Sequence, residues 1–307
     1  MSRAPNERTI VFLIGAVQFI NILDFMMVMP LGPDFAAELG IDASKLGIIG
    51  GAYTASASFA GLAGAFVLDR WDRRTALLAT MAGLVLATAL GGFAGGLGSL
   101  VLARLLAGAF GGPATSIALS IVTDVVPPAR RGRAMGAVMG AFSVASVLGV
   151  PVGLELARLG GWRLPFFAVA GLGLPIVAYV SFAMPPLRGH LARTRQHGPA
   201  LLVELLRRPI VTLSLSGSAL MMAATFLIVP NISSFVQFNA GYPREHLGLL
   251  YSAGGLVSFF VMRLAGAMVD RLGAFRVAAL GCGLIVVVTT LGFFFGRPLM
   301  PVLALFI

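Results

Sequence analysis

The stretch TIVFLIGAVQFINILDFMMVMPLG, residues 9–32, holds one ionisable side chain, the carboxyl group of Asp24. A helix crosses roughly 30 Å of hydrocarbon with about 20 apolar residues, because each residue adds about 1.5 Å. The stretch meets that length, and it is too long for the apolar segment of a signal peptide and lacks a small-x-small cleavage site. We therefore predict that residues 9–32 form an uncleaved transmembrane helix.

Apolar runs of similar length recur along the chain. Apolar residues make up 58% of the sequence and charged residues 11%, whereas soluble domains carry about 25% charged residues. The sequence therefore predicts an all-α polytopic membrane protein. The further predicted spans cover residues 45–68, 75–97, 99–126, 133–157, 163–184, 209–236, 246–269 and 275–296, and a tenth begins near Pro298.

The basic excess of the chain, a formal net charge of +10, does not indicate nucleic-acid binding, because the arginines lie largely in short connectors. The single cysteine, Cys282, has no partner for a disulfide, and no metal-ligand spacing or nucleophile elbow is present. We therefore expect no nucleic-acid partner, no metal, no cofactor and no enzymatic activity.

The basic connectors lie mainly on one side of the predicted membrane. Positively charged connectors stay in the cytoplasm during insertion. With the N-terminus inside, the cytoplasmic segments hold about fifteen basic residues and the opposite segments about five, an asymmetry of roughly threefold. The N-terminus is therefore predicted to lie in the cytoplasm.

Two short motifs recur at a common distance. Leu-Gly at 46–47 recurs at 247–248, and Asp-Arg at 69–70 recurs at 270–271, both offset by 201 residues (247 − 46 and 270 − 69). Parallel repeats of this kind build transporters from two bundles that rock about a central site. We therefore predict two structurally related halves.

The longest polar stretch separates these halves. It covers residues 185–208 and is typical of a linker. We predict a first six-helix bundle at 1–184, a cytoplasmic linker at 185–208 and an incomplete second bundle at 209–307. The second part holds about three and a half predicted helices where symmetry requires six, so we expect about 90–100 further residues in a complete transporter.

The stretches AFVLDRWDRR at 65–74 and GAMVDRLG at 266–273 resemble the loop signature of the major facilitator superfamily, Gly-x-x-x-Asp-Arg-x-Gly-Arg-Lys/Arg. The departures are Ala65, Asp72 and Ala274. The resemblance implies two pseudo-symmetric six-helix bundles that the signature latches together on the cytoplasmic side. The residues implied in this gating are Asp69, Arg70, Arg73, Arg74, Gly266, Asp270, Arg271 and Gly273. The arginines of the first copy could instead serve only as topology signals.

Arg104-Leu-Leu-Ala-Gly108 resembles the fourth-helix element of the same family, an arginine followed by a glycine four residues later. An arginine within a span costs about 2.5–3.5 kcal/mol on insertion scales, so it normally faces a cavity or a partner. We expect Arg104 to contact the substrate or a proton network. The alternative is that its side chain extends to the membrane interface.

The fifth predicted span resembles the antiporter signature of exporters in this family. It carries Gly140 and then Gly149-Val-Pro151-Val-Gly153, where an extra valine separates glycine from proline and Leu154 replaces a family glycine. The resemblance implies a bacterial drug, sugar or nucleoside exporter of the drug/proton antiporter branch, in the cytoplasmic (inner) membrane. Equally, such glycine spacing serves helix packing alone.

Asp24 lies near the middle third of the first predicted span, close to Asn21. An ionised carboxylate there costs several kcal/mol, so its protonation should respond to access from either side of the membrane. We expect Asp24 to bind the coupling proton or a cationic group of the substrate, and the resemblance also implies a first-helix acid. Asn21 and, in the seventh span, Asn231 are further candidates. Asp24 could instead be structural, hydrogen-bonded to a neighbouring helix.

These features predict a monomeric secondary active transporter of a small-molecule solute, which works by alternating access in the lipid bilayer. Proton-coupled efflux is the expected mode. An ATP-driven pump would need a phosphate-binding loop, which the sequence lacks. The alternatives are a non-transporting receptor or partner-binding protein on a transporter scaffold, and an inactive fragment.

Overall fold

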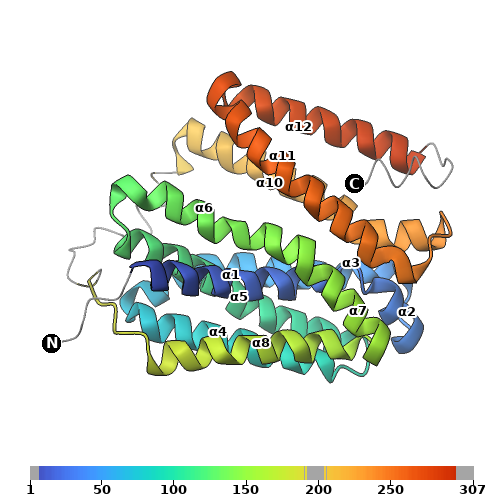
Figure 1. The fold of residues 1–307 in the computed structure, drawn as a ribbon, viewed down its shortest axis with the longest axis horizontal. Helices are drawn as coiled ribbons and strands as arrows, with labels where there is room; N and C mark the ends of the chain where they lie inside the picture. The colour runs from blue at the N-terminus through green and yellow to red at the C-terminus, as the bar shows by residue number, and fades with distance from the viewer. Residues whose placement is uncertain (1–6, 190, 192–203, 205, 295–307) are drawn as a thin grey trace.

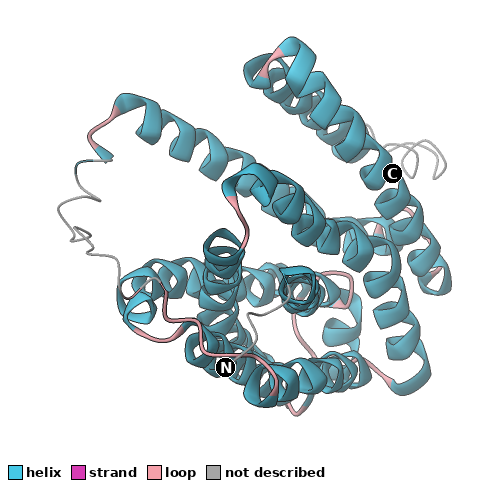
Figure 2. Cartoon of the chain, turned by 60° about the vertical axis from the view of Figure 1, so that its left-hand side comes forward, coloured by secondary structure: helices cyan, strands magenta, loops and turns pink. Residues whose placement is uncertain are grey.

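The computed structural model describes residues 7–189, 191, 204 and 206–294 (Figure 1). Every regular element in these ranges is a helix, as Figure 2 shows. The first half comprises α1 (Glu7–Val28), α2 (Gly32–Leu39), α3 (Leu46–Val67), α4 (Arg73–Gly92), α5 (Leu97–Val125), α6 (Pro128–Val144), α7 (Val150–Gly160) and α8 (Arg163–Phe182). The second half comprises α10 (Pro209–Phe238), α11 (Leu247–Leu272) and α12 (Ala274–Thr289).

Each of the nine predicted spans coincides with a helical segment. Within the described residues, 7 helices are long and apolar enough to cross a membrane. α3 and α11 begin at Leu46 and Leu247, which repeats the offset of 201 residues (247 − 46) found in the sequence. The predicted tenth span lies outside the described residues, as does most of the predicted linker at 185–208.

The first predicted span ends earlier than expected. α1 stops at Val28, so the prediction of a single helix over 9–32 is wrong at its end. Pro30 has no backbone N–H and its ring clashes with the preceding turn, which ends the helix. The chain then forms the unpredicted short helix α2, with Pro33 in its first turn and Gly40 in the left-handed conformation (φ 60°) at its end.

The fifth span is a helix with an irregular turn. The predicted run at 133–157 is divided into α6 and α7 by a π-helical turn, Ala145–Gly149. Pro151 stands at the start of α7 and cannot donate a backbone hydrogen bond to the preceding turn. The helix therefore continues through a wider turn rather than breaking.

Close contact between α3 and α5 forms the centre of the first half. A Cβ atom at Gly108 would overlap the carbonyl oxygen of Tyr53, and one at Gly112 would overlap the carbonyl oxygen of Ala57. Small residues at this spacing let two helix backbones approach in lipid, where packing rather than water exclusion drives association. The glycine of the fourth-helix element therefore has a packing role in this structure.

Replacing Gly112 with alanine should lower the thermal unfolding midpoint in detergent, because the added methyl group forces α3 and α5 apart. Overpacking of this kind costs about 1–3 kcal/mol. Gly98→Ala is the matched control, since Gly98 lies on the same helix with open space around it. Equal midpoints for the two variants would contradict the packing role.

Candidate functional site

Three helices bring polar side chains to one point inside the first half. Arg104 of α5 faces Asp24 of α1, with its Nη2 3.0 Å from Oδ2 and its Nη1 3.1 Å from Oδ1. Thr88 of α4 donates its hydroxyl to Asp24 Oδ1 at 2.7 Å. The side chains of Asp24 and Arg104 are 0% and 1% exposed, so this is a fully buried, bidentate ion pair.

The burial of this pair answers an alternative raised by the sequence. Arg104 does not extend to the membrane interface, because its guanidinium is enclosed within the bundle. A buried charge is tolerated only when it is paired and hydrogen-bonded, and Asp24 supplies both oxygens. The charge of each residue therefore compensates the burial of the other.

A second layer of polar groups surrounds the pair. The Arg104 guanidinium carbon lies 4.7 Å from the centre of the Tyr53 ring, within range of a cation–π interaction. The Tyr53 hydroxyl donates to Asn21 Oδ1 at 2.5 Å. Asn21 Nδ2 in turn donates to the Gly111 carbonyl at 2.8 Å and to Thr115 Oγ1 at 2.6 Å.

Three members of this network, Tyr53, Thr88 and Thr115, were not predicted from the sequence. The signal they carry is weak, because single hydroxyl groups are common in membrane helices and often bond to their own backbone. The Thr88 hydroxyl is within hydrogen-bond distance of Asp24 and also of a carbonyl group of its own helix, that of Leu84, at 2.8 Å. Only the packing of α1, α3, α4 and α5 shows that these hydroxyls converge.

The network is not saturated. Among the described residues, Arg104 Nε and Gln18 Oε1 are buried without a hydrogen-bond partner. Gln18 lies on α1, as do Asn21 and Asp24. Arg104 Nε is therefore a free donor within the ion pair itself, while Gln18 lies six residues before Asp24 on α1.

The loop signature lies far from this site. Arg73 and Thr88 are fifteen residues apart on α4, which is roughly 22 Å along a helix axis. Arg73 is buried and pairs through Nε with Asp124 Oδ2 at 3.2 Å, while Arg74 donates to the carbonyl groups of Val180 and Ser181. Arg73 and Arg74 thus connect α4 to α5 and α8 within the first half.

The remaining signature residues are described only in part. The backbones of Asp69, Gly266 and Asp270 are helical, but their side-chain surroundings lie outside the described part of the chain. Arg70 and Arg271 are exposed. Gly273 has φ 84° at the junction of α11 and α12, a left-handed conformation that favours glycine.

Asp72 stands where the family signature has glycine. Its carboxylate caps α4 by accepting from Arg74 N at 2.9 Å, and it also accepts from Leu187 N at 3.1 Å and Arg188 Nε at 2.9 Å. Burial alone would raise the pKa of Asp72, but these hydrogen bonds and the Arg188 charge hold it below its ordinary value. The departure from the signature thus ties α4 to the segment after α8.

The glycines of the fifth span divide into two groups. A Cβ atom at Gly149 would lie 2.6 Å from Leu23 Cδ1, and one at Gly153 would lie 3.7 Å from Met27 Cβ, so both face α1. Gly140 has nothing within 4 Å of such an atom. Pro151 begins α7 after the π turn. Helix packing therefore accounts for Gly149 and Gly153 but not for Gly140 or for Gly136, the fourth glycine of this span.

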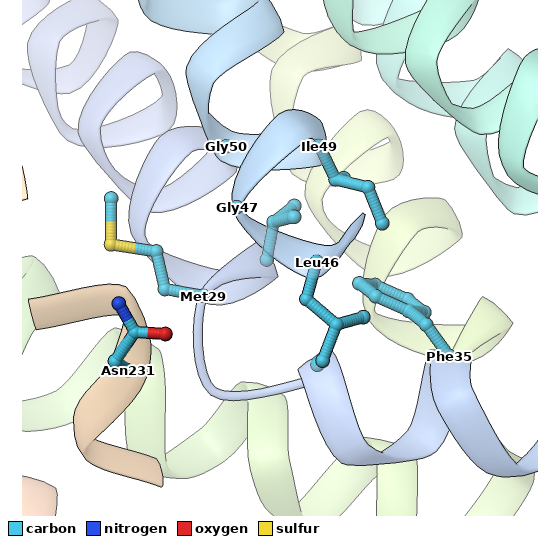
Figure 3. Close-up of a pocket in the computed structure, with 9 residues that line it drawn as sticks. Met29, Phe35, Leu46, Gly47, Ile49, Gly50 and Asn231 are labelled. Carbon is cyan, nitrogen blue, oxygen red and sulfur yellow. The ribbon is translucent and has the colours of Figure 1, made fainter. Parts of the chain in front are cut away.

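The structure does not bring Asn231 to the ion pair. Asn231 donates to the Leu227 carbonyl of its own helix at 2.9 Å. It lines a cavity of about 20 Å³ between α10 and the α1 to α3 region, which has room for about one water (Figure 3). Met29, Gly47 and Gly50 lie around it. Asn21, by contrast, belongs to the network around Asp24.

A buried ion pair in a bundle of membrane helices, with a second half in which α11 begins 201 residues after α3 of the first (247 − 46), is characteristic of a transporter that alternates access across a bilayer. The profile of the Major Facilitator Superfamily matches residues 14–307. The chain belongs to this family. It is therefore an integral membrane secondary transporter of a small solute with the two-bundle fold, and the predicted family, fold and transport class are confirmed.

Sequence relatives include exporters. The chloramphenicol resistance protein of Streptomyces lividans is 30% identical over 294 residues, which are 95% of this chain and 74% of that protein. The purine ribonucleoside efflux pump NepI of Escherichia coli K12 is 27% identical over 290 residues, which are 94% of this chain and 71% of that protein. The chain thus spans roughly three quarters of these relatives.

Solved structures share the fold at low sequence identity. The xylose transporter XylE from E. coli, in a partially occluded inward-open conformation, has a TM-score of 0.78 at 16% identity, covering 98% of this chain and 83% of that one. A bacterial homolog of the human lysosomal transporter Spinster has a TM-score of 0.75 at 19% identity, covering 99% and 72%.

Arg104→Gln should destabilise the protein by about 3–5 kcal/mol, because it leaves the Asp24 carboxylate buried without a countercharge. The double variant Asp24→Asn/Arg104→Gln should recover most of that loss, since both charges are gone. The measurement is thermal unfolding of the unmodified protein, the single variants Asp24→Asn and Arg104→Gln, and the double variant in the same detergent. A double variant as unstable as the sum of both single variants would contradict a direct pair.

Asp72→Asn should lower the unfolding midpoint at pH 7 and lose that effect in acid. The pKa of Asp72 is lowered in the folded protein, so its contribution is complete above the unfolded value of about 3.9 and disappears as the pH falls through the folded value. Midpoints measured between pH 7 and pH 3 test this. Glu155→Gln, at an exposed ion pair, is the control and should change little at any pH.

Proposed function

We propose that this transporter exports a small organic solute in exchange for protons, and that Asp24 carries the proton. The observation that carries the proposal is the fully buried Asp24–Arg104 pair, which joins α1 to α5 through both carboxylate oxygens. A structural role alone could be filled by apolar residues of similar volume at little cost in stability. An intramembrane pair of this kind is functional by default.

The ion pair supports the exchange of a proton for the solute because each of its two charges stabilises the other. A proton that binds Asp24 neutralises the carboxylate and removes the countercharge of Arg104. The guanidinium then relies on the Tyr53 ring or on an electron-rich group of the solute. Loss of the proton restores the pair, so proton and solute compete for the site.

The direction and placement of the protein are part of this proposal. The arginine asymmetry supports an N-terminus in the cytoplasm of a bacterial inner membrane. The exporters among the relatives support efflux, with drug-like or nucleoside-like molecules as the solutes to test first. The signature residues Asp69 and Asp270 remain proposed gating residues on the cytoplasmic side, and a monomer is the proposed unit.

Asp24→Asn should abolish transport driven by a pH gradient, because an amide cannot bind and release the proton. Inverted membrane vesicles that contain the chain are given an acidic lumen, and uptake of radiolabelled chloramphenicol and of a purine ribonucleoside is followed. Wild-type vesicles should accumulate at least one of the two. We expect a drop of at least about tenfold in the variant, the scale on which loss of an essential proton site acts.

Glu155→Gln is the control for this measurement, since Glu155 is also a carboxylate near the membrane but is exposed and pairs within its own helix. Full gradient-driven accumulation by Asp24→Asn would overturn the proton-carrying role. Binding of a solute without accumulation in wild-type vesicles would favour a receptor built on a transporter scaffold.

A further inference from the structure

One ion pair joins the two halves at the end of the molecule that carries α2. Arg244, in the short 3₁₀ turn Arg244–His246 before α11, places its Nη2 2.5 Å from Oδ1 of Asp34 in α2. The two side chains are 32% and 17% exposed, so water screens the pair only in part. Among the described residues, the second carboxylate oxygen of Asp34 is buried without a hydrogen-bond partner.

The backbones of the two halves also meet at this end. A Cβ atom at Gly255 of α11 would lie 3.0 Å from the Cα of Val147, in the π turn of the fifth span. One at Gly32 of α2 would lie 3.6 Å from the Ser234 hydroxyl of α10. Val236 of α10 and Leu247 and Leu250 of α11 are buried here. The halves are therefore in close contact around the Asp34–Arg244 pair.

The opposite end of the molecule is different. The first half of α10, from Pro209 to Ala223, is almost entirely exposed, and in the last part of α11 the described side chains of Val261, Leu264, Arg271 and Leu272 are exposed as well. Figure 1 shows α11 lying beside α7 at the right of the view and diverging from the first half toward the left. The contacts between the halves are thus concentrated at the α2 end, and the signature loops lie at the end where the halves diverge.

We propose that Asp34 and Arg244 form a latch that holds the two halves together at the α2 end and must break when the transporter opens there. The pair exists only when α2 and the turn before α11 are in contact, so its free energy favours the state seen here over the alternate one. With the N-terminus in the cytoplasm, this latch lies on the outer side. It then acts opposite to the cytoplasmic loop signature.

The latch is expected to be moderate in strength. A partly exposed ion pair contributes little to stability, and a contact that breaks in every cycle has to be weaker than the solute-driven difference between states. The uncompensated second oxygen of Asp34 also favours release, because it gains water when the halves separate. Asp34 and Arg244 therefore set how often the α2 end opens.

The test measures how fast a thiol at the contact reacts. Cys282 is exposed and is replaced with serine, and Ser234→Cys supplies the reporter beside Gly32. Labelling of the purified full chain by a maleimide should accelerate about three- to tenfold in Asp34→Asn and Arg244→Gln, as a modest shift in population predicts. The charge swap Asp34→Arg/Arg244→Asp should return the rate toward that of the parent.

Glu38→Gln is the matched control. Glu38 lies on the same short helix, but it pairs with Arg163 of the first half at 3.3 Å, so its loss should leave the labelling rate unchanged. Acceleration in Glu38→Gln equal to that in Asp34→Asn would overturn the latch, because it would show only loosening of α2. An unchanged rate in Asp34→Asn would overturn it as well.

The salt dependence of the labelling rate is a second measurement, and it needs no further substitution. Raising the salt concentration from about 0.05 M to about 1 M shortens the screening length from roughly 14 Å to roughly 3 Å and should accelerate labelling in the parent protein. The rate in Asp34→Asn should respond less to salt, because only the weaker interaction between Arg158 of α7 and Glu245 then remains between charges of the two halves at this contact. Equal responses in both proteins would contradict the latch. Neither readout depends on proton coupling, so the latch and the proposed proton exchange fail separately.

Discussion

A charged side chain inside the hydrocarbon of a membrane needs a countercharge next to it. Asp24 and Arg104 provide this for each other, and the arrangement of the helices in the first half depends on their contact. The pair can form only if α1 and α5 lie at the right depth and rotation. Thr88 adds a third helix and Tyr53 a fourth, so the polar network also fixes how α3 and α4 sit against the pair. The apolar contacts around it supply packing, but the polar contacts select one arrangement of the helices.

Hydropathy was sufficient to predict the helices, because membrane thickness sets the length of an apolar span. The prediction was wrong where local chemistry intervened. Pro30 ended the first helix four residues early and allowed α2 to form, and Pro151 imposed a π turn on the fifth span. Proline marks such places in the sequence, but it does not say whether a helix stops or continues.

Individual residues of the candidate site could be predicted from the sequence, but the contacts between them could not. Asp24 and Arg104 stood out because ionisable residues are rare in spans, yet nothing in their spacing of eighty residues says that they touch. Asn21 proved to be part of their network, and Asn231 did not, because its pseudo-symmetric depth said nothing about which neighbour it faces. Pairing across helices is a property of rotation and tilt, which hydropathy does not encode.

The π turn at Ala145–Gly149 changes the helical phase of the fifth span. One additional residue in a turn advances every later side chain by about 100° around the axis. Gly149 and Gly153 are thereby aimed at α1, while Val147 within the turn and the backbone of Pro151 remain available to α11. One helix thus serves both halves, with its contacts to α1 and its contacts to α11 on separate faces, and a deletion of one residue in this turn would rotate both faces by about 100° relative to the start of the span.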